Sequence, residues 1–206
     1  MFKKKKYTVI RQAISKDLAN FVANYFRMQK QVYDTCKQAR YFSPFETIIG
    51  YYEGEDEQIP NTYSQYANMA METLLLKCQP GMEKATGLKL YPAYTYARIY
   101  KKGDELKRHK DRFSCEISTT MNLAGDDWPI YLEPSGETGK KGVKVDLKQG
   151  DMLVYSGCEL EHWREKFKGK ECVQVFLHYN NRKTPGSKDN MFDKRPHLGL
   201  PSWFKR

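Results

Sequence analysis

Two histidines and one aspartate in this sequence have the residue types and the spacing of a metal site. His109 precedes Asp111 by two positions, in the sequence Arg-His-Lys-Asp, and His162 follows 53 positions after His109. Side chains two residues apart point to the same side of an extended chain, so His109 and Asp111 can converge on one cation. Two imidazoles and one carboxylate fill three positions of an octahedron and leave the opposite face open. We therefore predict that these three residues bind a metal ion.

The order of the surrounding elements favours this interpretation over a chance pair. A predicted strand and a glycine turn precede His109, and several predicted strands separate it from His162. The alternative is that His109 is a solvated loop residue and that His162 caps its strand. His178 lies in an aromatic strand segment and is interpreted as a packed structural residue. His197, in the C-terminal tail, is interpreted as structural or exposed.

The elements that position these residues begin with predicted helices. Ser15 is expected to cap a first helix, whose apolar residues recur at helical spacing: Leu18, Phe21, Val22, Tyr25 and Phe26. A second helix is expected to end before Pro80, with one face made of Tyr66, Met69, Ala70, Thr73 and Leu74. Residues 43–61, between the helices, are rich in turn-forming and acidic residues. They predict a loop, which is either a lid over the site or surface decoration.

After Gly87 the pattern changes to the two-residue period of β-strands, which is clearest from Tyr94 to Tyr100. Further strands are predicted at residues 116–123, 130–133, 143–147, 152–155 and 172–179. Helices first and many short strands afterwards predict an α+β fold, a β-sandwich or barrel with a helical layer packed on it. We expect one domain over residues 1–206, with helical support in 1–90, the β core in 91–180 and a wrapping tail in 181–206.

The composition narrows the class of protein. A hydrophobic content of 40% in 206 residues is enough for a sizeable core. No apolar run approaches the roughly 18 residues of a membrane span, and the N-terminal stretch lacks the apolar segment of a signal peptide. Five scattered cysteines without a paired spacing argue against a disulfide framework and favour a cytoplasmic location. The net charge of +10 indicates either an anionic partner or a solvated surface. Nucleic acid stays possible, but no binding motif supports it.

A series of short motifs runs through the predicted strands: Tyr96-Ala-Arg-Ile-Tyr100-Lys-Lys-Gly103, His109-Lys-Asp111, Met121-Asn-Leu123, Gly150-Asp-Met-Leu-Val-Tyr155 and Glu161-His162-Trp-Arg164. This series resembles the Fe(II)/2-oxoglutarate-dependent dioxygenase superfamily, particularly its prolyl 4-hydroxylase-like branch. The resemblance covers about the C-terminal half of the chain. It implies a double-stranded β-helix (jelly-roll or cupin-like) with iron at one open end. It also implies an oxidoreductase that binds Fe(II) through the two histidines and the aspartate and uses 2-oxoglutarate, with ascorbate as a possible stimulant.

The resemblance further implies a cationic side chain for the far carboxylate of 2-oxoglutarate, on the strand after the distal histidine. A buried carboxylate needs such a partner. The sequence departs from the usual spacing, because the residue ten positions after His162 is Cys172. Arg164 is favoured slightly over Lys170 as the anchor, and surface charge is the alternative for both. Tyr100 is expected either to donate its hydroxyl to the same carboxylate or to pack as an aromatic. Asn122 is expected to line the pocket.

The substrate is the part of the function that the sequence defines least. The branch resemblance points first to a prolyl or other amino-acid residue in a protein or peptide, which the enzyme would hydroxylate at a C–H bond. A small molecule comes next, and nucleic acid is a third possibility. A non-catalytic metal-binding β-barrel belongs to a different class and also stays open, because a fold does not fix a function.

Overall fold

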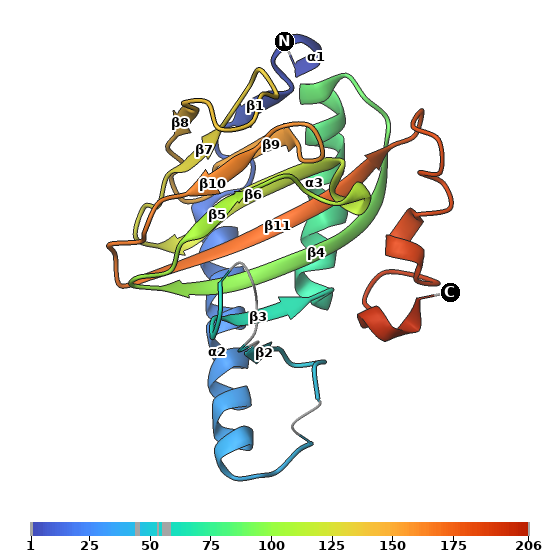
Figure 1. The fold of residues 1–206 in the computed structure, drawn as a ribbon. Helices are drawn as coiled ribbons and strands as arrows, with labels where there is room; N and C mark the ends of the chain where they lie inside the picture. The colour runs from blue at the N-terminus through green and yellow to red at the C-terminus, as the bar shows by residue number, and fades with distance from the viewer. Residues whose placement is uncertain (1, 44–45, 53, 55–58, 206) are drawn as a thin grey trace.

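Two β-sheets face each other in the computed structural model, which describes residues 2–43, 46–52, 54 and 59–205 (Figure 1). Every strand pair between described residues is antiparallel. The larger sheet has the order β1 (Tyr7–Ile10), β9 (Met152–Ser156), β6 (Ile117–Gly125), β11 (Glu171–Asn181), β4 (Leu90–Lys101), β3 (Tyr63–Tyr66) and β2 (Tyr51–Tyr52). The smaller sheet has the order β5 (Leu106–His109), β10 (His162–Arg164), β7 (Ile130–Leu132) and β8 (Val143–Val145).

The larger sheet buries both faces, since one faces the smaller sheet and the other is covered by helices α2 (Lys16–Gln38) and α3 (Met69–Thr86) (Figure 1). Met121, Val173 and Val175 pack against the helices in the main hydrophobic core. Leu153 and Tyr155 point the other way and pack against the smaller sheet. This alternation follows from the period of two along a strand. It confirms the predicted α+β architecture of a β-sandwich with a helical layer.

Helix α2 begins where the sequence predicts. The Ser15 side chain accepts a hydrogen bond from the Leu18 backbone N–H at 3.2 Å. The predicted apolar face is only partly correct, because Val22 and Phe26 are buried but Phe21 is 70% exposed. The buried face is instead made of Ala19, Val22, Ala23, Phe26 and Tyr33. Small alanines allow the helix to approach the sheet closely on this side, which a search for large apolar residues overlooks.

Helix α3 corrects the second helical prediction, because it continues through Pro80 to Thr86 and ends at Gly87 in the left-handed conformation. Asn68 caps its start by accepting hydrogen bonds from the backbone N–H groups of residues 70 and 71. Tyr66 belongs to β3 rather than to the helix, and Met69 is 69% exposed. Burial of Met82 and other apolar residues against the sheet offsets the backbone hydrogen bond that a proline removes.

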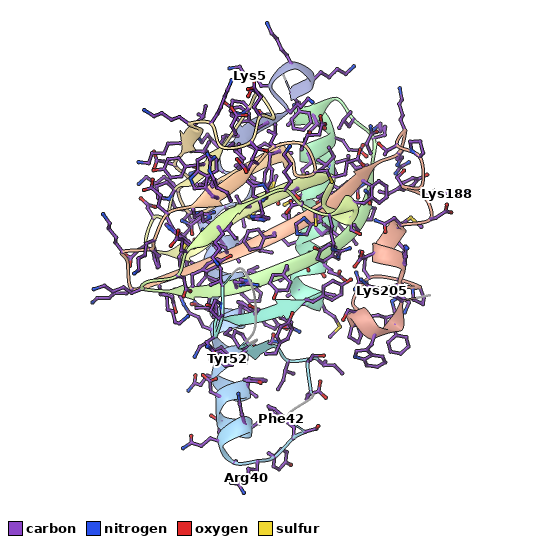
Figure 2. All side chains as sticks on the ribbon, in the orientation of Figure 1. Lys5, Arg40, Phe42, Tyr52, Lys188 and Lys205 are labelled. Atoms are coloured by element: carbon purple, nitrogen blue, oxygen red, sulfur yellow. The ribbon has the colours of Figure 1, made fainter. Side chains whose placement is uncertain are left out.

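The first 90 residues are less uniformly helical than predicted, because β1 extends one edge of the larger sheet, and β2 and β3 extend the other. Residues 44–45, 53 and 55–58 of the predicted 43–61 loop lie outside the described residues, so its role as a lid stays a prediction. Figure 2 shows Phe42 and Tyr52 beside the C-terminal end of α2. Both rings contact Tyr33, with centroids 5.3 and 5.7 Å away. Within the described part of the chain, no helix is long and apolar enough to cross a membrane.

Short turns η1 (Phe113–Cys115), η2 (Met191–Lys194) and η3 (Ser202–Phe204) complete the description, together with the N-terminal helix α1 (Phe2–Lys5). The tail that contains η2 and η3 runs beside β4 (Figure 1). It is attached by two buried charged side chains, Asp193 and Arg195. Arg195 forms an ion pair with the buried carboxylate of Glu72 on α3, at 2.7 Å. The described part of the tail therefore packs on the body of the protein.

Candidate metal centre

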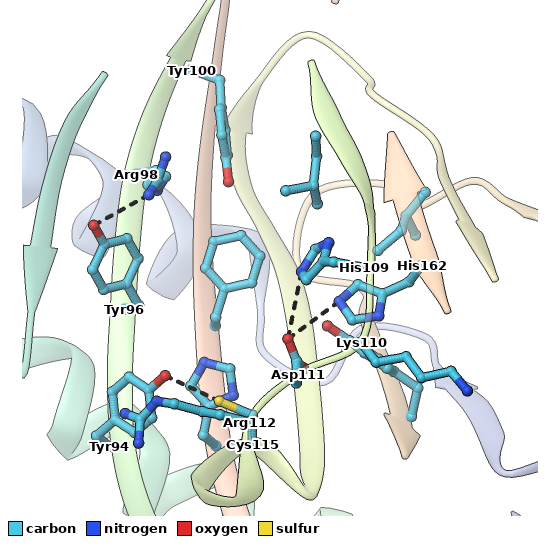
Figure 3. A pocket seen from close by; sticks show the side chains of 15 residues that line it. Tyr94, Tyr96, Arg98, Tyr100, His109, Lys110, Asp111, Arg112, Cys115 and His162 are labelled. Carbon is cyan, nitrogen blue, oxygen red and sulfur yellow. Dashed lines mark hydrogen bonds and ion pairs between the residues drawn. The ribbon is translucent and has the colours of Figure 1, made fainter. Parts of the chain in front are cut away.

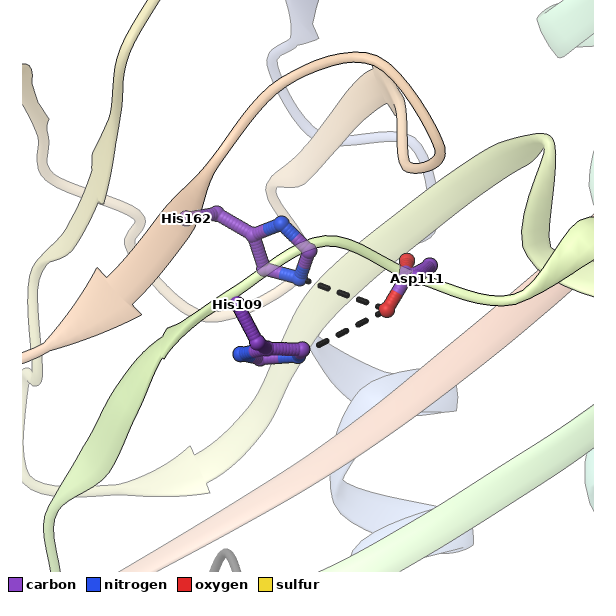
Figure 4. Close-up of side chains that lie close together, drawn as sticks. All are labelled: His109, Asp111 and His162. Atoms are coloured by element: carbon purple, nitrogen blue, oxygen red, sulfur yellow. Dashed lines mark ion pairs between the residues drawn. The ribbon is translucent and has the colours of Figure 1, made fainter. Parts of the chain in front are cut away.

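His109, Asp111 and His162 lie together where two strands of the smaller sheet meet (Figure 4). His109 is the last residue of β5 and His162 is the first residue of β10, and antiparallel pairing places them directly opposite each other. Asp111 follows β5, and its Oδ1 atom lies 3.5 Å from His109 Nε2 and 3.4 Å from His162 Nε2. One ligand atom from each residue falls within 4.8 Å of the others. The three donors can therefore bind one ion.

Both imidazoles are oriented by backbone carbonyl groups. His109 Nδ1 lies 2.8 Å from the Lys107 carbonyl oxygen, and His162 Nδ1 lies 3.0 Å from the Leu160 carbonyl oxygen. A carbonyl oxygen only accepts hydrogen bonds, so each Nδ1 must carry the proton. The unprotonated Nε2 of a neutral imidazole is then left to bind a metal. Both Nε2 atoms face Asp111, where a bound metal ion would replace any proton that they share with the carboxylate.

Asp111 is held from behind by groups that the sequence analysis missed. Its Oδ2 accepts a hydrogen bond from Ser118 Oγ at 2.9 Å, and its backbone N–H donates to the Gly157 carbonyl at 2.9 Å. Burial alone would raise the pKa of the Asp111 carboxyl, but His162 and His109 more than offset this and hold the pKa well below its usual range. The carboxylate stays ionised, as a metal ligand must.

Position 157 requires a glycine, because the backbone there passes close to the candidate metal site. A Cβ atom at that position would collide with Asp111 Oδ2 and with the Cys115 carbonyl oxygen. Only glycine fits between them. Gly157 closely follows the motif Gly150-Asp-Met-Leu-Val-Tyr155, but its contact with Asp111 depends on the fold and not on local sequence.

His178 is buried and lies nearer to the site than its interpretation as a packed strand residue suggested. Its ring stacks on Tyr94 with centroids 4.5 Å apart, and its Nδ1 lies 3.0 Å from Ser118 Oγ. Ser118 therefore links His178 to Asp111. Burial lowers the pKa of His178 to about 4, although the nearby Asp111 carboxylate opposes the shift. A neutral imidazole therefore lines the pocket at neutral pH.

A cavity of about 350 Å³ opens beside the three predicted ligands (Figure 3). Tyrosines of β4 form one wall, among them Tyr94, Tyr96 and Tyr100. Phe176 of β11 also lines the cavity. Asp111 is the sole carboxylate among the described residues that line the cavity, while Arg98, Lys110 and Arg112 supply positive charge. The site thus combines an aromatic wall with positively charged side chains around it.

Arg164 is a fully buried arginine with no carboxylate partner in the described part of the chain. Its Nη atoms donate to the Trp128 carbonyl oxygen and, at 3.0 Å, to Thr120 Oγ1, while its Nε is buried without a partner among the described residues. Burial lowers the pKa of this guanidinium, and Tyr100 and Tyr155 of the pocket lining are among the groups that counteract the shift. Buried charges normally have an opposite charge beside them. A bound anion such as the far carboxylate of 2-oxoglutarate would satisfy Arg164.

The remaining predicted cosubstrate residues lie in different places. Tyr100 lines the cavity. Neither Lys170 nor Arg164 is among the residues that line the cavity, but Lys170 is exposed just before β11 whereas Arg164 is buried. Asn122 is buried and pairs with Gln174 across β6 and β11, but it is not among the lining residues of this cavity.

The donor set and the buried cation together fit the groups that the resemblance implies. Two imidazole nitrogens and one carboxylate leave coordination positions for further ligands, as Fe(II) oxygenase sites require. The residues around Arg164, namely Trp128, Thr120 and Gln174, were not identified from the sequence. Gln174 had a signal, because it lies within the strand predicted at residues 172–179.

Comparison with known proteins yields no match to a family model and no match to a curated protein. Solved structures do match. A Pseudomonas putida prolyl-4-hydroxylase superposes with a TM-score of 0.62 at 14% identity, over 88% of this chain and 95% of that one. A Trichoplax adhaerens prolyl hydroxylase, in complex with a peptide of hypoxia inducible factor, superposes with a TM-score of 0.62 at 12% identity over 88% and 86%. HygX from Streptomyces hygroscopicus, with nickel and 2-oxoglutarate bound, gives 0.59 at 12% over 88% and 85%.

These likenesses establish the fold. The chain has the double-stranded β-helix fold of the 2-oxoglutarate- and Fe(II)-dependent oxygenases, and its structural neighbours include prolyl hydroxylases. The fold predicted from the sequence motifs is therefore confirmed. In this chain the three predicted metal ligands lie where β5 and β10 pair. This placement is observed in the structure itself and does not depend on the comparisons.

Proposed function

We propose that this protein is an Fe(II)- and 2-oxoglutarate-dependent dioxygenase that hydroxylates a C–H bond. Two residues of strand β10 carry the proposal, and both lie at the same end of the β-sandwich. His162 belongs to the His-Asp-His cluster, and Arg164, two residues further along β10, is a buried cation without a carboxylate partner in the part of the chain that the structure describes. Residues two apart on a strand point to the same face, so both serve the interior of the sandwich.

His109, Asp111 and His162 would hold Fe(II), and Arg164 would bind the far carboxylate of 2-oxoglutarate, assisted by Tyr100. Bound together, Fe(II) and 2-oxoglutarate activate O2 for insertion of a hydroxyl group, with release of succinate and CO2. The protein's own part is to position the reactants. The carbonyls of residues 107 and 160 orient the imidazoles, and the aromatic side chains give the cavity an apolar wall.

A prolyl or other amino-acid residue of a polypeptide is the first candidate substrate. It is supported by the prolyl hydroxylases among the structural neighbours, one of which is a complex with a peptide. A small molecule is the second candidate, supported by the neighbours SnoN and SnoK from nogalamycin biosynthesis, an epimerase and a carbocyclase. The cavity of about 350 Å³ lies within the range of small-molecule sites.

The test is succinate formation from 2-oxoglutarate by anaerobically purified protein after addition of Fe(II), ascorbate and air. We expect turnover in the wild type and in the control His197→Ala, since His197 is exposed in the tail. We expect none in His109→Ala or Asp111→Ala. The visible charge-transfer band of the Fe(II)–2-oxoglutarate chelate gives a second readout. A wild type that binds neither iron nor 2-oxoglutarate contradicts the proposal, and zinc binding without the band favours a non-catalytic metal-binding protein.

A further inference from the structure

The C-terminal segment, residues 182–205, contains an unusual backbone turn beside the candidate site. Phe192, Asp193 and Lys194 have consecutive positive φ angles of 57°, 56° and 65°. Each residue other than glycine costs about 1–2 kcal/mol in this left-handed conformation. Such strain persists only where surrounding contacts hold it in place, and it is concentrated at functional sites. The contacts of this turn therefore indicate what it is for.

Asp193, at the centre of the turn, is 2% exposed and fully paired. Its Oδ1 accepts hydrogen bonds from Arg112 Nη1 at 2.8 Å and from Ser114 Oγ at 2.6 Å. Its Oδ2 accepts from Arg112 Nη2 at 3.0 Å and from Tyr66 Oη at 2.6 Å, and it lies 2.7 Å from Lys205 Nζ. One carboxylate thus connects the tail to β3 and to the loop that follows the metal ligands.

Arg112 is the principal partner, and it follows Asp111 directly in the sequence. Its guanidinium carbon lies 4.7 Å from the ring centroid of Tyr94, and both residues line the cavity (Figure 3). Asp193 holds Arg112 through both Nη atoms, while the Arg112 Nε–H has no hydrogen-bond partner among the described residues. The guanidinium is therefore fixed on one side and retains a donor for another group.

We propose that Asp193 is a positioning residue that fixes Arg112 at the cavity, so that Arg112 receives a carboxylate group of the substrate. The tail is then part of the site, and acidic substrates are preferred over neutral ones. The charge of the lining agrees with this preference, since Asp111, a predicted metal ligand, is the sole carboxylate among the described residues that line the cavity. The inference rests on the proposed function in one respect, because it identifies the ligand of Arg112 as the substrate of that reaction. Its test uses metal-free protein and is independent of turnover.

The experiment measures the rate at which phenylglyoxal modifies Arg112, by mass spectrometry of the peptide that contains it. We expect slow modification in the wild type and a rate about tenfold higher or more in Asp193→Asn, because two charge-assisted hydrogen bonds are weakened. Asp193→Glu should restore part of the protection. Asp189→Asn is the matched control, because Asp189 is an exposed acid of the same segment. Equal rates in Asp193→Asn and Asp189→Asn would overturn the positioning role.

A second arm tests the carboxylate preference with benzoate and its neutral counterpart benzamide as probes. Benzoate should slow the modification of Arg112 in the wild type, whereas benzamide should not. The protection should be lost in Asp193→Asn, because the guanidinium is no longer fixed at the cavity. If benzoate protects no better than benzamide, Arg112 is not a carboxylate site. A failure of the proposed function would appear separately, in the succinate assay.

Discussion

Replacement of Arg164 by methionine is expected to weaken 2-oxoglutarate binding severely. Arg164 is 1% exposed, and its partners among the described residues are neutral oxygens. The cosubstrate carboxylate would therefore supply the counter-charge that these partners lack. Removing one partner of a buried ion pair costs about 3–5 kcal/mol. At about 1.4 kcal/mol for each factor of ten, the Kd for 2-oxoglutarate should rise roughly 150-fold or more. Anaerobic titration of the chelate band measures this Kd without any substrate.

The same substitution should have a different effect on stability when no ligand is present. Burial of the charged Arg164 is unfavourable, as its lowered pKa indicates, so Arg164→Met should not lower the Tm of the metal-free protein by more than a few degrees. Fe(II) with 2-oxoglutarate should raise the Tm of the wild type far more than that of the variant. Lys170→Met is the matched control and should bind 2-oxoglutarate normally. Normal binding by Arg164→Met, or loss of binding by Lys170→Met, would refute the reasoning.

Three further results are expected. Gly157→Ala should abolish iron binding measured by metal analysis, since its Cβ would displace the Asp111 carboxylate; retained iron would contradict this contact. Tyr100→Phe should raise the Kd for 2-oxoglutarate about tenfold in the same titration, if its hydroxyl donates one hydrogen bond to a charged group; an unchanged Kd would make Tyr100 a packed aromatic only. Because His178 has a folded pKa of about 4, below its unfolded value of about 6.5, the unfolded state binds more protons between these values. Unfolding free energy from denaturant titrations should therefore fall by up to about 3 kcal/mol from pH 6.5 to pH 4, and this fall should be smaller in His178→Gln.

The predictions that succeeded from sequence depend on local periodicity. Alternation with a period of two located β4, β6, β7, β8, β9 and β11, and the hydroxyl of Ser15 marked the start of α2. The same local reasoning failed at Pro80, because the packing of residues beyond it on the sheet decides whether the helix continues. It also missed β5 and β10, which are too short to show a period.

The sequence by itself determined the types of the candidate metal-binding residues and the two-residue spacing of His109 and Asp111. Only the tertiary structure decided that His162 lies opposite His109, since that contact depends on the antiparallel register of β5 and β10. Tertiary structure also separated the two anchor candidates, because Arg164 is buried in the sandwich while Lys170 is exposed. The physical reason is the same in both cases. Local sequence fixes which way neighbouring side chains point, whereas desolvation and pairing over long separations depend on which surfaces the folded chain brings together.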